Sequence, residues 1–106
     1  MVLAQSAPAA TTATSIYTAP TGKIASIDTL LVCNRGAASS YRVYLTYNPS
    51  SIQTKEYIYY DTPILANDTF TAEISITISG AITVGIYSTS GNISFTLLGE
   101  EINASK

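Results

Sequence analysis

Residues 70–79 alternate between apolar and polar side chains without interruption. The apolar positions are Phe70, Ala72, Ile74, Ile76 and Ile78, and the polar positions between them are Thr71, Glu73, Ser75, Thr77 and Ser79. This period of two residues is typical of a β-strand with one face in a hydrophobic core and the other in water. No segment of the chain repeats its apolar residues at the helical period over the length of an ordinary helix. We therefore expect an all-β protein.

Further runs of β-type residues, separated by turn residues, fill most of the remaining chain. They cover residues 15–18, 23–33, 41–47, 55–61, 81–88 and 93–98. Ile24 and Ile27 are out of phase within one run, which predicts a β-bulge there. Pro63 is expected to end the run before it, because proline has no N–H for the β-ladder. The spacing of the runs predicts an antiparallel β-sandwich of seven or eight strands, with a jelly-roll-like architecture.

The N-terminal residues differ in composition from the rest of the chain. Residues 1–14 are rich in Ala, Ser, Thr and Pro, so they have few large apolar side chains to bury. We expect a flexible, extended arm over 1–14, one sandwich domain over 15–102 and a C-terminal tail over 103–106. Such an arm can become ordered on a neighbouring subunit or add a strand to its sheet; the alternative is a remnant of an expression vector. The candidate interface residues of the arm are Leu3, Gln5 and Pro8.

Charged residues make up only 11% of the 106 residues, against about 25% in an average protein. Ser, Thr, Asn and eight Tyr replace them, and such a surface can form hydrogen bonds without desolvating ions. This suits contact with other proteins, although β-sheets also favour Thr and Tyr in any case. A net charge of −2 with five Lys and Arg provides no basic stripe for phosphates. Neither nucleic acid nor an anionic membrane is therefore an expected partner.

Residues suited to catalysis or metal binding are scarce. The sequence has no histidine, which removes the commonest general base and a principal zinc ligand. The single cysteine, Cys33, lies in an apolar run and is expected to be a buried, inert thiol. Asn67, Asp68 and Thr69 lack the ligand pattern of a calcium loop and are interpreted as an Asx turn. We expect no enzymatic activity, cofactor or small-molecule substrate; a hydrolase with two facing carboxylates is the alternative.

The N-terminus also bears on where the chain folds. Its first residues lack the basic and apolar regions of a secretion signal, and no run approaches the roughly 18 apolar residues of a membrane span. With one cysteine, no disulfide can form within the chain. We therefore expect folding in a reducing cytoplasm.

Tyrosine is the most informative side chain for binding. Tyr57, Tyr59 and Tyr60 lie in one run and are candidate interface residues, since tyrosine supplies contact area at a low entropic cost. Both faces of that run carry aromatic or aliphatic groups, so either both are covered or one meets a partner. The alternative for these tyrosines is core packing with cross-strand pairing. In the run 41–47, alternation places Tyr41, Val43, Leu45 and Tyr47 on one face and Arg42, Tyr44 and Thr46 on the other.

Four segments of the chain resemble small structural proteins of tailed bacteriophages. They are IYTAPTGK (16–23), VCNRG (32–36), YYDTPILANDT (59–69) and ISFTLLGEEI (93–102). In that class a β-sandwich decorates or cements the capsid, or belongs to the tail. The resemblance extends over about residues 16–102 and carries no catalytic signature.

What the resemblance implies is a homo-oligomer, often a homotrimer in capsid cement proteins, that binds the major capsid protein of the assembled shell. The expected location is the virion, after synthesis in the bacterial host cytoplasm. Two alternatives stay open: a tail or neck component, and a carbohydrate-binding or adhesive β-sandwich that uses Tyr57, Tyr59 and Tyr60 as stacking surfaces.

Overall fold

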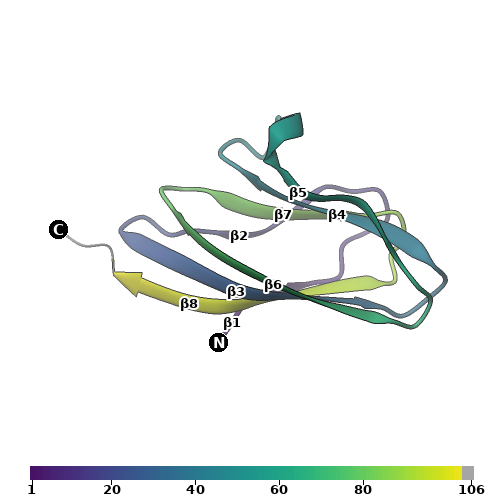
Figure 1. Ribbon diagram of the computed structural model, residues 1–106. Coiled ribbons are helices and arrows are strands. Elements are labelled where there is room, and N and C mark those ends of the chain that lie inside the picture. The colour runs from purple at the N-terminus through teal and green to yellow at the C-terminus, as the bar shows by residue number, and fades with distance from the viewer. Residues whose placement is uncertain (104–106) are drawn as a thin grey trace.

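A computed structural model describes residues 1–103 and shows two layers of strands (Figure 1). The elements are β1 (Val2–Ser6), β2 (Thr14–Thr18), β3 (Lys23–Asn34), β4 (Ser39–Thr46), the 3₁₀-helix η1 (Thr54–Glu56), β5 (Tyr57–Ile64), β6 (Thr69–Ser79), β7 (Thr83–Ser88) and β8 (Ile93–Asn103). All strand pairs are antiparallel, and the strands form two four-stranded sheets with the orders β1-β8-β3-β6 and β2-β7-β4-β5. The expected all-β sandwich is confirmed.

The pairing follows the jelly-roll pattern. β4 pairs with β5, β3 with β6, β2 with β7 and β1 with β8, so the chain is one long antiparallel ribbon that closes between β4 and β5. Successive pairs of this ribbon alternate between the two sheets, which is how eight strands wrap into a double-sheet jelly roll. The wrapping buries the inner face of each sheet against the other.

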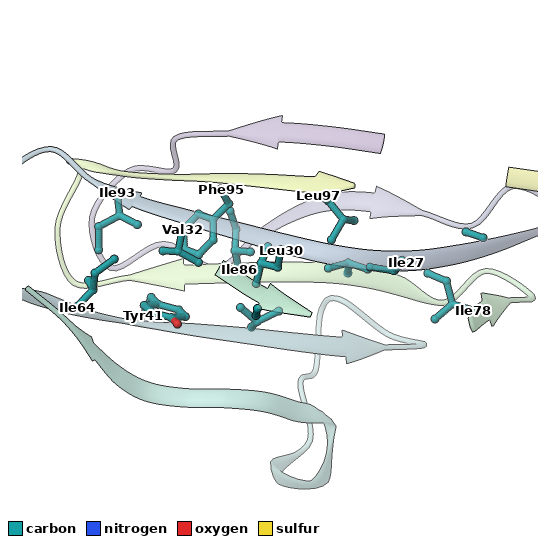
Figure 2. Close-up of a cluster of buried hydrophobic side chains, with 14 of the residues drawn as sticks. Ile27, Leu30, Val32, Tyr41, Ile64, Ile78, Ile86, Ile93, Phe95 and Leu97 are labelled. Carbon is teal, nitrogen blue, oxygen red and sulfur yellow. The ribbon is translucent and has the colours of Figure 1, made fainter. Parts of the chain in front are cut away.

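The hydrophobic core lies between the two sheets (Figure 2). The largest fully buried side chains there include Ile27, Leu30 and Val32 of β3, Tyr41 and Val43 of β4, Ile86 of β7, and Ile93, Phe95 and Leu97 of β8. Four of the five apolar positions of β6 also face the core, whereas Phe70 is 39% exposed. Ala72 and Ile78 are buried, whereas Ile74 and Ile76 are only half-buried because β6 lies at the edge of its sheet.

A bulge interrupts β3, but not where the phase change of Ile24 predicted it. The register runs unbroken from Ile24 to Ile27 and shifts between Ile27 and Thr29, toward both β6 and β8. Ala25, and not Ile24, occupies the core position in phase with Ile27. Because alanine is small, the sequence pattern pointed to Ile24 as the core residue instead. Gly99 of β8 lies opposite Ile27, where a Cβ atom would come within 2.1 Å of the Ser26 carbonyl oxygen.

Two strands are longer than expected. β5 continues through Thr62 and Pro63 to Ile64. Proline is tolerated in β5 because β5 is an edge strand, and the N–H that proline lacks would be needed only if another strand paired on that side. β8 extends past Leu98 to Asn103, paired throughout with β3. The expected C-terminal tail lies outside the described residues except for Asn103, which ends β8.

Part of the expected N-terminal arm is a strand. Residues 2–6 form β1 and pair with β8 of the same chain. Leu3 and Ala4 pack against the core, and Pro8 is buried. Without β1, β8 would be an edge strand with unpaired backbone groups. The residues of β1 form a strand through backbone pairing with β8, and their composition does not reveal this pairing. Cys33 is half-buried, not fully buried as expected.

Candidate protein-interaction face

The outer face of the β2-β7-β4-β5 sheet carries a cluster of aromatic side chains around one arginine. We name it the tyrosine face, and it comprises Arg42, Tyr44, Tyr57, Tyr60 and Tyr87. The strand register builds it: Arg42 lies opposite Tyr87, and Tyr44 lies opposite Tyr57. Their neighbours Tyr41 and Val43 point the other way, into the core (Figure 2 labels Tyr41).

Arg42 is held between aromatic rings. Its guanidinium carbon lies 4.2 Å from the ring centroid of Tyr60 and 4.6 Å from that of Tyr87, both within cation–π range. Asp61 fixes the same side chain, because Arg42 Nε donates to Asp61 Oδ1 at 2.6 Å. This hydrogen bond raises the pKa of Arg42 further above its usual value, so the guanidinium stays charged. The charge of the Arg42 guanidinium is therefore paired with Asp61, and its planar surface is covered by the rings of Tyr60 and Tyr87.

The rings of the tyrosine face also support one another. Tyr57 packs edge-on against Tyr44, with centroids 5.9 Å apart, and against Tyr60, with centroids 4.9 Å apart. Tyr44 is buried to 2% exposure although it lies on the outer side of the sheet, whereas Tyr60 remains 58% exposed. The face therefore presents a pre-ordered aromatic surface with Tyr60 most accessible to a partner.

Irregular pairing of β5 decides which tyrosines belong to this face. The register with β4 shifts on both sides of Val43, and Asp61 adopts a positive φ of 48°. Tyr57 and Tyr60, three positions apart, therefore share the outer face. Tyr59 faces inward instead and packs against Tyr41 and Phe70, at centroid distances of 6.2 and 6.0 Å.

A hollow of about 490 Å³ adjoins the tyrosine face. It is lined by Tyr57 and Tyr60 on one side and by Ile52 and Thr54 of the preceding loop on the other. Aromatic walls with a few polar groups are suited to holding a side chain or small polar molecule.

The structure does not bring the other sequence-predicted interface residues to this face. Leu3, Gln5 and Pro8 belong to β1 and the segment after it, on the opposite sheet or at its edge. Leu3 packs against the core and Pro8 is buried, while Gln5 Nε2 donates to Thr96 Oγ1 at 3.5 Å. Only Tyr57 and Tyr60 of the predicted set lie in one surface cluster.

Sequence reasoning missed Arg42, Tyr44 and Tyr87 as members of a common surface. Alternation in β4 correctly separated Arg42 and Tyr44 from the core-facing Tyr41 and Val43. The sequence contained no signal for the approach of Tyr87 to Arg42, because that contact depends on β4 pairing with β7.

Within residues 1–103, no three His, Cys, Asp or Glu side chains lie close enough together to form a metal site. No helix in the same range has the length and apolar character that a membrane span requires. Comparison of the chain with protein-family models, curated proteins and solved structures gave no match.

Proposed function

We propose that this chain is a non-enzymatic structural protein of a tailed-phage virion, a capsid decoration or cement protein that binds the assembled shell through its tyrosine face. The observation that carries the proposal is the pre-ordered cluster around Arg42, with Tyr60 exposed and the arginine charge already paired with Asp61. Tyrosine and arginine are among the side chains enriched at the energetic centres of protein interfaces.

The proposed partner is the major capsid protein of the shell. A low-charge surface with fixed aromatic rings loses little side-chain entropy on binding and desolvates few ions. If the protein binds the assembled shell and not free capsid subunits, binding stabilises the intact particle by linkage. This mechanism needs no cofactor and no chemical step.

The test is cosedimentation of the protein with shells assembled from the major capsid protein of the same virus. We expect binding to shells and not to unassembled capsid subunits. Tyr60→Ala should weaken shell binding at least tenfold, as expected for an interface anchor. Ile102→Ala is the matched control, since Ile102 is 51% exposed but lies on the other sheet. Absence of binding, or equal binding by both variants, would contradict the proposal.

The hollow between Tyr57, Tyr60 and Thr54 favours one second candidate, a carbohydrate-binding module. A tyrosine ring can stack on a sugar while Thr54 and nearby polar groups bond its hydroxyls. A glycan array in which Tyr60→Ala abolishes a specific signal would support this function. An array without any signal would remove it.

A further inference from the structure

The loop 47–53 connects the end of β4 to η1 and forms a wall of two hollows. One is the hollow of about 490 Å³ beside the tyrosine face, to which the loop contributes Ile52. The other is a groove of about 470 Å³ that the loop lines with Tyr47 and Gln53. Tyr57 borders both hollows. The position of this loop therefore sets the shape of the surface around Tyr57.

Apolar packing contributes little to the order of the loop. Ile52 is half-buried, and the other six residues of 47–53 are exposed. Figure 1 shows η1, which follows the loop, projecting from the sandwich beside the start of β5. A segment with so little buried surface depends on its hydrogen bonds for a fixed position.

Short-range hydrogen bonds between neutral groups run along the loop. The Asn48 N–H donates to Oγ1 of the buried Thr46 at 3.0 Å. The Ser51 N–H donates to the Asn48 carbonyl oxygen at 3.0 Å, and Gln53 Nε2 donates to the Ser51 carbonyl oxygen at 3.2 Å. Each bond of this kind adds only modestly to stability.

The carboxylate of Glu56 connects the two ends of the loop. At its end, the Gln53 N–H donates to Glu56 Oε1 at 2.8 Å, and the Glu56 N–H donates back to the Gln53 carbonyl oxygen at 3.0 Å. At its start, the Thr46 hydroxyl and the Tyr47 N–H also donate to the carboxylate. Bonds to an ionised acceptor are stronger than bonds between neutral groups. Glu56 is therefore the main anchor of the loop.

The same bonds make this anchor sensitive to acid. The bond from the Gln53 N–H, more than any other contact, lowers the pKa of Glu56 from its ordinary value of 4.5, and partial desolvation opposes the shift without cancelling it. The bonds are therefore present above the pKa of the unfolded chain and are lost as the pH falls through that of the folded protein. The other titratable groups lining the groove are Tyr47, Lys55 and Tyr57, and tyrosine and lysine do not change charge in acid solution.

We infer that Glu56 is an acid-sensitive latch: its ionised carboxylate holds the loop 47–53 in place, and its protonation releases the loop from the two hollows. The latch thereby regulates the surface around Tyr57 and Tyr60, because the loop supplies one wall of the hollow that these tyrosines border. The ordering of the loop is independent of what the protein binds. The effect of the latch on shell binding rests on the proposed function.

Amide NMR spectra of the full chain over a pH series test the latch. We expect the amide signals of Tyr47 and Gln53 to shift together with one midpoint below pH 4.5. At neutral pH, Glu56→Gln should speed exchange of the Gln53 amide with solvent about tenfold or more, because a neutral acceptor replaces an ionised one. It should also remove the shared titration. Glu73→Gln is the matched control, since Glu73 is an exposed carboxylate on β6, and it should change neither result.

Thr46→Val is a second variant, which removes one donor to the carboxylate and keeps the shape of the side chain. It should move the shared midpoint toward pH 4.5. A midpoint that does not move would count against the latch, since Glu56 would then not connect both ends of the loop. A shared titration that persists in Glu56→Gln, or equal exchange of the Gln53 amide in wild type and Glu56→Gln, would overturn the latch directly.

Cosedimentation with shells at neutral pH separates the latch from the proposed function. Weaker shell binding by Glu56→Gln than by Glu73→Gln supports regulation of the tyrosine face, and equal binding overturns that regulation. A wild-type chain that binds no shells contradicts the proposed function, while the NMR result still decides whether Glu56 holds the loop.

Discussion

Tyr44 of β4 lies across Gly85 of β7, so closely that a Cβ atom built on Gly85 would be 2.0 Å from the Cζ atom of the tyrosine ring. Glycine in a strand interior leaves its backbone uncovered and weakens the sheet. The Tyr44 ring covers that backbone and is itself buried to 2% exposure. The two residues therefore form one packing unit beneath the tyrosine face.

We expect Gly85→Ala to lower the free energy of unfolding by about 1–3 kcal/mol, because the added methyl group displaces the Tyr44 ring. In a Tyr44→Ala background the same substitution should be neutral or stabilising, since alanine suits a strand better than glycine once the ring is gone. Urea unfolding of the four proteins measures this coupling. Gly91→Ala is the control, because its nearest contact would be an ordinary 3.9 Å. If the effects of Gly85→Ala and Tyr44→Ala on the free energy of unfolding were additive, the two residues would not form one packing unit.

Tyr41→Phe should raise the free energy of unfolding by about 1 kcal/mol. The Tyr41 hydroxyl is buried and has no hydrogen-bond partner among the described residues, so the folded state bears its desolvation cost. Phenylalanine keeps the ring contacts with Phe95 and Tyr59 and removes the unpaired group. Thermal and urea unfolding measure the change. Tyr47→Phe, at a 73% exposed position, should change the stability by less than about 0.5 kcal/mol.

Stability should decline in alkaline solution above pH 10. Burial raises the pKa of Tyr41 from 10.0 to about 12. Burial, and then the 2.5 Å hydrogen bond that Tyr17 donates to Glu101, holds the pKa of Tyr17 higher still. Between pH 10 and 12 the unfolded chain releases these protons while the folded chain keeps them, so unfolding becomes easier as pH rises.

The expected slope is about 1.4 kcal/mol per pH unit for each such tyrosine. Urea unfolding over a pH series measures it. Tyr41→Phe should flatten the decline between pH 10 and 12, because one of the shifted groups is gone. An unchanged slope would mean that Tyr41 ionises in the folded protein as readily as in the unfolded chain.

Leu3→Ala should lower the free energy of unfolding by about 1–2 kcal/mol, because Leu3 packs against the core from β1. Val2→Ala, at the adjacent exposed position, should stay within about 0.5 kcal/mol of the wild type. Chemical unfolding of both variants decides between a docked strand and a free arm. Equal free energies of unfolding for Leu3→Ala and Val2→Ala would indicate that residues 2–6 form a free arm and not a docked strand.

The alternation of side chains in the sequence was enough to predict an all-β sandwich and most inward positions. Tyr41, Val43 and Leu45 face the core as their spacing predicts, and so do Ala72, Ile74, Ile76 and Ile78 of β6. Tyr47 and Phe70 were predicted on the same faces, but both are exposed. Failures occurred where the local pattern was weak. Small residues hid β1, and Ala25 took the core position that Ile24 seemed better suited to fill.

Two members of the candidate site, Tyr57 and Tyr60, were visible in the sequence, but Arg42, Tyr44, Tyr87 and the geometry of the site were not. Tyr57, Tyr59 and Tyr60 were recognised as a group, yet irregular pairing in β5 separates Tyr59 from the other two. Arg42 meets Tyr87 only because β4 and β7 are neighbours in one sheet.

The sequence by itself determined that the segments after residue 14 form strands and which faces of most of them are apolar, because alternation is a property of residues next to one another in the chain. Only the tertiary structure decided which strands pair, where the bulges lie and what gathers on each outer face. Those features depend on contacts between distant segments, such as Tyr17 with Glu101 across the two sheets, and no local pattern encodes them.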